Sequence, residues 1–271
     1  MKKPLVCAFS KHLQFLDYAA LAKKSKELGL DGLDLTVRKG GHVEPANVAR
    51  DLPRAVEAIC AEGLEVPMIT TNLHRGDDPD ARPILEAASR LGIPYFRIGG
   101  QNYAKDAHPA DQLRTFTEEV RSLIGLAEEF NMTAGYHNHS GYDNVGAPLW
   151  DLYLMIRDVG SSRLGSNLDM AHAAIEGAYG AWEINARLLA PYVKMMAAKD
   201  FVWDGDKPRW VPLGTGIVKS AAFLKILREA DFHGPISMHY EYDIKSHDEM
   251  LEEVRKSALT LRAELQRAGY E

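Results

Sequence analysis

The sequence has few cysteines and no long apolar segment. Its two cysteines, Cys7 and Cys60, lie far apart in apolar surroundings, and such a pair forms neither a disulfide framework nor a thiolate metal motif. We expect both thiols to be buried and reduced. No apolar run approaches the roughly 20 residues of a membrane span, and the run near the N-terminus is too short for a signal peptide. These features predict a cytoplasmic protein that does not enter a membrane; a leader peptide that had been removed would leave no trace.

The chain also lacks a positive net charge and the motifs of several enzyme classes. Its formal net charge at pH 7 is -6, which does not suggest a surface for nucleic acid. No glycine-rich phosphate loop follows the first apolar run, and no serine or cysteine is paired with a base. Hydride transfer from a dinucleotide and covalent acyl chemistry are therefore poorly supported.

Short apolar runs alternate with amphipathic helical segments along the whole chain. Several of the helical segments end in glycine, which is a common helix stop. The runs cover Leu5–Ser10, Asp31–Val37, Leu64–Thr70, Tyr95–Gly99, Met132–His139, Leu164–Met170, Val193–Asp200 and Pro235–Tyr242. Eight such runs are the number that a closed parallel barrel needs. The pattern predicts a single (β/α)8 TIM barrel domain over residues 1–271 and favours it over an open doubly wound sheet.

Side chains alternate between the two faces of a strand, so each run predicts one set that points into the barrel. Apolar residues such as Leu33, Leu35 and Leu168 are expected to face the helices. The expected inner set is mostly polar and comes from strand C-termini, where barrel active sites are built. It comprises Asp34, Thr36, Arg38, Arg97, Gly135, His137, His139, Asn167, Asp169, Ser237, His239 and Glu241, with Lys199 added if Met195 and Ala197 face inward. Because buried polar groups are costly without a partner, this convergence predicts a functional pocket.

Histidines and carboxylates dominate this expected pocket. The residues are His137, His139, Asp169, His172, His239 and Glu241. Nitrogen and oxygen donors of this kind suit Zn2+, Mn2+ or Co2+. Four other histidines, His12, His108, His233 and His247, are assigned structural roles.

Two loops offer further candidates. Arg38, His42 and Glu44 surround paired glycines after the second run, and Trp203 and Trp210 follow the seventh. The tryptophans could stack on a sugar or simply cover the barrel mouth. The segment VPLGTGIVKS is expected to form a tight loop rather than an anion site, because no basic residue precedes its turn.

Several segments resemble the xylose isomerase-like TIM-barrel superfamily, the sugar phosphate isomerase/epimerase group, over nearly the whole chain. They are DGLDL, YHNH, LDMAHA, AAKD, PLGTGIV and HGPISMHYEY, of which LDMAHA and PLGTG are the most specific. The resemblance implies a metal held by a Glu, an Asp, a His and a Glu on strands five to eight. In this chain His137 replaces the first Glu, Asp169 matches, Ala197 replaces the His, and His239 replaces the last Glu. Glu241 follows His239 by two residues on the same expected face.

These observations assign a role to each candidate residue. We expect a divalent ion (Mn2+, Zn2+ or Co2+) on His137, Asp169, His239 and Glu241. Glu241, His239 and His172 are the candidate bases, and Lys199 would steady a developing enolate. The expected substrate-binding residues are Arg38, His74, Arg97, His139 and Trp203.

The predicted activity is that of a sugar isomerase or epimerase. It would act on a keto or aldo sugar, or on a cyclic polyol, by removing a proton next to a carbonyl. Three alternatives stay open: a dehydratase or lyase on a keto-sugar or keto-inositol, a metal-free sugar-binding relative, favoured by Ala197, and an abasic-site endonuclease, disfavoured by the net charge. The expected partner is a small sugar or polyol, and a homo-oligomer is compatible with the sequence.

Overall fold

Parallel strands close into a barrel in a computed structural model that describes residues 3–271. The closed order is β1-β10-β7-β6-β5-β4-β3-β2. The strands are β1 (Val6–Phe9), β2 (Gly32–Thr36), β3 (Glu65–Thr70), β4 (Tyr95–Arg97), β5 (Thr133–His137), β6 (Leu164–Asp169), β7 (Val193–Ala198) and β10 (Ile236–Met238). Each of the predicted runs contains one of these strands, so the predicted (β/α)8 barrel is confirmed.

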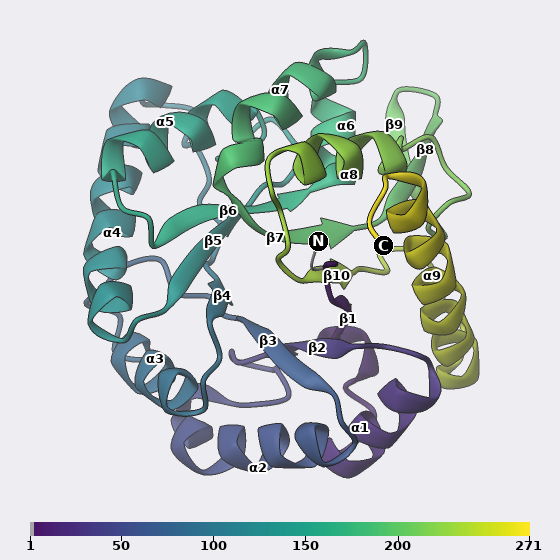
Figure 1. The fold of residues 1–271 in the computed structure, drawn as a ribbon. Helices are drawn as coiled ribbons and strands as arrows, with labels where there is room; N and C mark the ends of the chain where they lie inside the picture. Colours follow the sequence, from purple (N-terminus) through teal and green to yellow (C-terminus); the bar gives the residue numbers. More distant parts are fainter. Residues whose placement is uncertain (1–2) are drawn as a thin grey trace.

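Helices form an outer ring around the strands (Figure 1). The α-helices are α1 (Tyr18–Glu27), α2 (Val48–Ala61), α3 (Ala81–Arg90), α4 (Pro109–Glu129), α5 (Leu149–Val159), α6 (Met170–Glu176), α7 (Ala181–Leu189), α8 (Ser220–Glu229) and α9 (His247–Arg267). Short 3-10 turns are η1 (Ser10–Leu13), η2 (Pro45–Asn47) and η3 (Ala190–Tyr192). Among residues 3–271, no helix has the length and apolar character needed to cross a membrane.

The alternation of side chains along the strands follows the prediction. Leu33, Leu35 and Leu168 lie in the apolar layer between the strands and the helices. On the inner face, the Asp34 carboxylate accepts hydrogen bonds from Thr70 Oγ1 and Ser237 Oγ, each at 2.8 Å. Burial raises the pKa of Asp34 to about 6. These bonds join β2, β3 and β10 through the barrel interior and form a polar layer below the rim.

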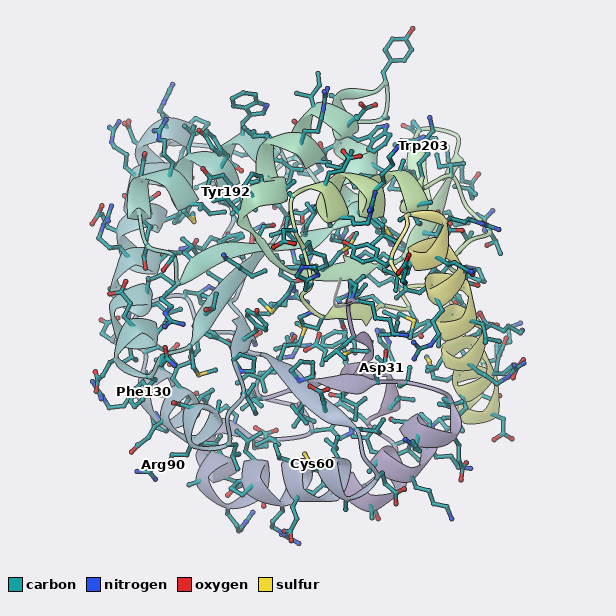
Figure 2. All side chains as sticks on the ribbon, in the orientation of Figure 1. Asp31, Cys60, Arg90, Phe130, Tyr192 and Trp203 are labelled. Atoms are coloured by element: carbon teal, nitrogen blue, oxygen red, sulfur yellow. The ribbon has the colours of Figure 1, made fainter. Side chains whose placement is uncertain are left out.

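The cysteine prediction is right for Cys7 and wrong for Cys60. Cys7 is buried on β1, whereas Cys60 is exposed near the end of α2 (Figure 2). The buried stripe of α2 consists of Val48, Leu52, Ala55 and Ile59. Cys60 follows directly after Ile59, so the 100° turn per residue of an α-helix carries its thiol off that stripe.

An antiparallel hairpin follows β7 where the sequence indicated only a loop. Its strands are β8 (Asp200–Asp204) and β9 (Lys207–Val211), and the chain then returns through the PLGTG segment to α8. The Asp200 carboxylate accepts backbone N–H bonds from Phe201, Gly214, Gly216 and Val218 at 2.9, 3.1, 2.9 and 3.0 Å. The glycine-rich turn is therefore a tight loop, as predicted, and the anion that it surrounds is the chain's own carboxylate.

The η1 turn carries a histidine with a structural role. The backbone N–H of Tyr240 donates to His12 Nε2 at 3.2 Å, which ties η1 to the segment after β10. Burial, with help from the Lys11 charge, lowers the pKa of His12 from 6.5 to about 4. The imidazole is neutral at neutral pH and can accept this bond.

Gly216→Ala should destabilise the hairpin root. A Cβ at this position would lie 2.2 Å from Asp200 Oδ1 and 2.4 Å from the Phe201 carbonyl oxygen, so the carboxylate would lose backbone donors. We expect a loss of about 2 kcal/mol in the free energy of unfolding, measured by urea titration. Gly125→Ala in α4 is the control, because a Cβ there meets nothing within 4 Å, and it should be neutral or slightly stabilising. Equal stability of the two variants would contradict this account of the loop.

His12 should make the protein less stable in acid. Its folded-state pKa is lowered, so the unfolded chain binds the proton more readily, and stability is lost as pH falls below about 6.5 toward 4. We expect its contribution to be about 3 kcal/mol over this interval. His12→Gln, which keeps an acceptor for Tyr240, should flatten the pH dependence of urea unfolding relative to the wild-type protein. An unchanged slope in His12→Gln would assign the acid sensitivity to other groups.

Candidate functional site

The C-terminal ends of β5, β6, β7 and β10 bring the predicted polar residues together. His137 ends β5, Asp169 ends β6, Lys199 follows β7 and His239 follows β10. The His137 Nε2 atom lies 3.6 Å from Asp169 Oδ2, and Lys199 Nζ lies 3.2 Å from the same oxygen. All four side chains are buried. The expected convergence of these residues at one end of the barrel is present in the fold.

Asp169 is held by its backbone and by one of its carboxylate oxygens. It is the N-cap of α6, and its Oδ1 atom accepts from the backbone N–H groups of Ala171 and His172 at 2.9 and 3.0 Å. The Asn138 side chain accepts from the Asp169 N–H at 2.7 Å and donates to its carbonyl at 3.1 Å. Only Oδ2 is left to face the site. Lys199 forms an ion pair with this oxygen, but the contact does not have the geometry of a hydrogen bond.

The Lys199 ammonium lies at the centre of a group that we call the Lys199 cluster, formed by Lys199, Asp169, His172 and Glu241. Besides its contact with Asp169, Nζ lies 2.7 Å from Glu241 Oε1 and 2.8 Å from His172 Nε2. The Trp210 ring covers it, with 4.4 Å between Nζ and the ring centroid. An ammonium group only donates, so His172 accepts at Nε2 and carries its proton at Nδ1. This proton is donated to Ser140 Oγ at 2.8 Å.

The histidines around the cluster are neutral at neutral pH. Burial lowers the pKa of His137, His172 and His239 well below 6.5, and lowers that of His139 to about 3. The positive charges of Arg97 and Lys199 reinforce the effect. Neutral imidazoles can accept protons or bind a metal ion, so both predicted uses remain chemically open.

One set of donors fits a divalent cation. One ligand atom from each of His137, Asp169 and His239 can be chosen so that all lie within 4.8 Å of one another. Asp169 Oδ2 and His239 Nε2 are buried and have no hydrogen-bond partner in the described part of the chain, and two imidazoles with a carboxylate suit Zn2+, Mn2+ or Co2+. His137, His139 and His172 form a second such set. Glu241, a predicted ligand, belongs to neither set and binds Lys199 instead.

Two arginines lie beside the histidine side of the site. The guanidinium carbons of Arg38 and Arg97 lie 5.5 and 5.9 Å from the Phe9 ring centroid, and Phe9 in turn stacks on His239 at 4.5 Å. Burial lowers the pKa of Arg97 to about 10, which still leaves it charged at neutral pH. His139 lies near by, with its ring centroid 4.6 Å from that of His137. These three predicted substrate-binding residues thus surround the donor set.

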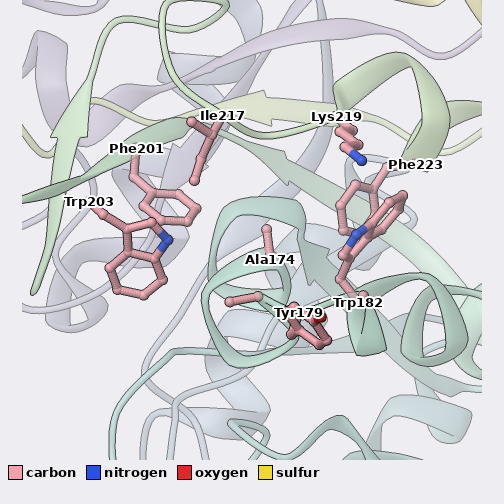
Figure 3. A pocket seen from close by; sticks show the side chains of 10 residues that line it. Ala174, Tyr179, Trp182, Phe201, Trp203, Ile217, Lys219 and Phe223 are labelled. Atoms are coloured by element: carbon pink, nitrogen blue, oxygen red, sulfur yellow. The ribbon is translucent and has the colours of Figure 1, made fainter. Parts of the chain in front are cut away.

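Two other predicted substrate-binding residues pack against different parts of the chain. His74 packs against the turn after β4, where a Cβ at Gly99 would come within 2.3 Å of its ring. Trp203 packs on Phe201, with 5.3 Å between ring centroids, and lines a separate cavity of about 390 Å³. Figure 3 shows Trp203 and Phe201 facing Trp182 and Phe223 in this aromatic cavity. The tryptophan that reaches the Lys199 cluster is Trp210.

A wider cavity leads toward the cluster from outside. It has a volume of about 650 Å³ and is lined by Asp204, Lys207–Pro212 and Glu241–Asp243. Trp210 and Glu241 line it and also contact Lys199. This outer cavity, between the hairpin and the segment after β10, is large enough for a monosaccharide. No pattern in the sequence indicated this cavity, because the two segments are brought together only by barrel closure.

Comparisons with known proteins agree on the fold. A xylose isomerase-like TIM barrel protein from Mycobacterium smegmatis, solved in complex with magnesium, is 18% identical and has a TM-score of 0.73 over 98% of this chain and 100% of that chain. The probable 3-DHS dehydratase from Bacillus anthracis is 16% identical, with a TM-score of 0.72 over 97% and 99% of the two chains. The 3-keto-D-glucoside 4-epimerase from E. coli is 14% identical, with a TM-score of 0.72 over 96% and 100%. A search of curated protein sequences found no match.

The sequence itself matches one protein family. The profile of the xylose isomerase-like TIM barrel covers residues 22–263, a range that includes the Lys199 cluster and the donor set of His137, Asp169 and His239. The match agrees with the resemblance carried by LDMAHA and PLGTG. The protein therefore belongs to the xylose isomerase-like TIM-barrel family.

Proposed function

We propose that the protein is a sugar-modifying enzyme that removes a proton next to a carbonyl group of a keto or aldo sugar or of a cyclic polyol. The observation that carries the proposal is the Lys199 cluster, in which a buried ammonium holds the Glu241 carboxylate at the mouth of a cavity. A base and a cation in contact are the two groups that enolisation needs. Sugar epimerases among the structural neighbours support this reading.

Glu241 is the base in this proposal. Its side chain is 39% exposed, whereas Lys199 is only 2% exposed, so the carboxylate can reach a molecule in the outer cavity. Oε1 binds Lys199, and Oε2 is left to take the proton from the substrate carbon. The electron pair of that C–H bond moves to the carbonyl oxygen and forms an enediolate, which the charges of Lys199 and Arg97 stabilise.

The fate of the enediolate decides the reaction. Return of the proton to the other face gives an epimer, and return to the neighbouring carbon gives an isomer. Loss of a β-hydroxyl group, with a proton, as water gives a dehydration product; the dehydratase among the structural neighbours supports this as the second candidate. Within the cluster, His172, whose Nε2 lies 2.8 Å from Lys199 Nζ, would exchange protons with Lys199.

A divalent ion would be held by His137, Asp169 and His239, whose donor atoms fit it. When bound, Mn2+, Zn2+ or Co2+ would polarise the substrate carbonyl as a Lewis acid. A structural neighbour solved in complex with magnesium supports the proposal of a bound divalent ion. A small sugar or polyol as partner, a cytoplasmic location and a homo-oligomeric state remain predictions.

Glu241→Gln should slow proton abstraction about 100-fold or more, the usual scale for losing a general base. The measurement is NMR in D2O over a panel of free and oxidised sugars, following deuterium uptake at one carbon or loss of water. Asp243→Asn is the matched control, because Asp243 lines the same cavity and is not part of the cluster. His239→Ala should slow the reaction to a similar extent by removing a donor. If both variants exchange at the wild-type rate on a confirmed substrate, His172 becomes the candidate base.

Asp169→Asn should lower the affinity for a divalent ion without unfolding the protein. The amide oxygen can still cap α6, but the oxygen that faces the site loses its negative charge or is replaced by a nitrogen. Calorimetric titration of Mn2+, Co2+ and Zn2+ into dialysed protein would measure the affinity, and circular dichroism would check the fold. Asp34→Asn, in the polar layer below the rim, is the control. Absence of binding to the wild-type protein at millimolar concentration of all three ions would remove the metal from the proposal.

A further inference from the structure

The Lys199 ammonium and the metal donor set share one atom. Asp169 Oδ1 is engaged by the backbone N–H groups of α6, so Oδ2 is the oxygen available to any cation. Lys199 Nζ already lies 3.2 Å from Oδ2. A metal bound to Oδ2 at about 2.1 Å would lie no farther than about 5.3 Å from the ammonium, the sum of the two distances.

We propose that the Lys199 ammonium competes with a divalent ion for Asp169. The site therefore binds such an ion weakly, and the ammonium supplies much of the positive charge of the site. The part concerning catalysis rests on the proposed function. The part concerning competition is independent of it, because it follows from the distances among Lys199, Asp169 and the two donor histidines.

The ammonium cannot easily move away to make room. Glu241 and His172 hold Nζ at 2.7 and 2.8 Å, and Trp210 covers it. The next residue, Asp200, accepts one backbone N–H bond from Phe201 in β8 and three from the loop that follows the hairpin, which fixes the main chain beside Lys199. Retreat of Lys199 would leave the buried His172 nitrogen without its donor.

Strand β7 therefore contributes a charge where it could have contributed a ligand. Ala197 is buried on the inner face, two residues before Lys199, and is in register with Asp169 on β6 and Ser237 on β10. Its methyl group offers no donor atom. The end of β7 thus supplies an ammonium group beside the donor set and no fourth donor within it.

Removing the charge should strengthen metal binding. We expect Lys199→Met to raise the affinity for Mn2+ at least about tenfold, because repulsion between a monovalent and a divalent cation at this distance is large even at an effective dielectric constant of 20. If Lys199→Met folds poorly, Lys199→Gln can replace it; this variant keeps a hydrogen-bond donor and should also raise the affinity for Mn2+. Lys199→Arg keeps the charge and should leave the affinity near the wild-type value. The measurement is calorimetric titration of Mn2+ into dialysed protein, with no sugar present.

Two controls make the result specific. Lys194→Met removes a charge at the other end of β7 and should not change Mn2+ affinity. Asp169→Asn added to Lys199→Met should abolish the gain. Three results would overturn the competition. They are an unchanged Mn2+ affinity in both Lys199→Met and Lys199→Gln, no Mn2+ binding by either folded variant, and an equal gain in affinity in Lys194→Met. If the gain is present but no sugar in the D2O panel exchanges its α-hydrogen, the competition stands and the proposed function fails.

Discussion

The position of Asp169 at the end of β6 is the constraint on which the rest of the site depends. Through Oδ1 the residue begins α6, and through its backbone it is bound to Asn138 after β5. Its remaining oxygen, Oδ2, therefore has a fixed position between His137 and Lys199. Asp169 thus links the start of α6, the contact between two barrel strands and the charge of the site. The other polar groups of the site are arranged around it.

The buried site keeps its charges in balance by keeping its histidines neutral. Lys199 is a buried cation and Arg97 a half-buried one, and they face the carboxylates of Asp169, Glu241 and Asp34. Burial and these cations lower the pKa values of the surrounding imidazoles, which would otherwise add further positive charge. A pocket with fixed cations and neutral imidazoles suits a substrate that becomes an anion during the reaction.

The hairpin β8–β9 divides the region above β7 into two cavities. On one side Trp210 covers Lys199 and lines the outer cavity next to Glu241. On the other side Trp203 lines the aromatic cavity near α6 and α7, which does not include the Lys199 cluster. The Asp200 carboxylate binds Phe201 in β8 and the loop after β9, so one residue fixes the root of the hairpin that carries both tryptophans.

Periodicity in the sequence was enough to determine the barrel and the inner face of its strands. Alternation along a strand is a local property, so His137, Asp169, Ser237 and His239 could be assigned to the interior without knowledge of the fold. The family resemblance came from equally local segments, LDMAHA and PLGTG. The exposed Cys60 shows the limit of such reasoning, because an apolar neighbourhood in sequence does not say which side of the helix a residue lies on.

Contacts between distant segments were decided only by the tertiary structure. Glu241 and Lys199 are 42 residues apart, and their ion pair withdraws Glu241 from the predicted metal ligands. Trp203 was the predicted substrate-binding tryptophan, and only the folded hairpin placed Trp210 over Lys199. The physical reason is the same in each case: sequence periodicity sets the direction of a side chain, whereas the partner that it meets depends on how barrel closure brings the strand ends and their loops together.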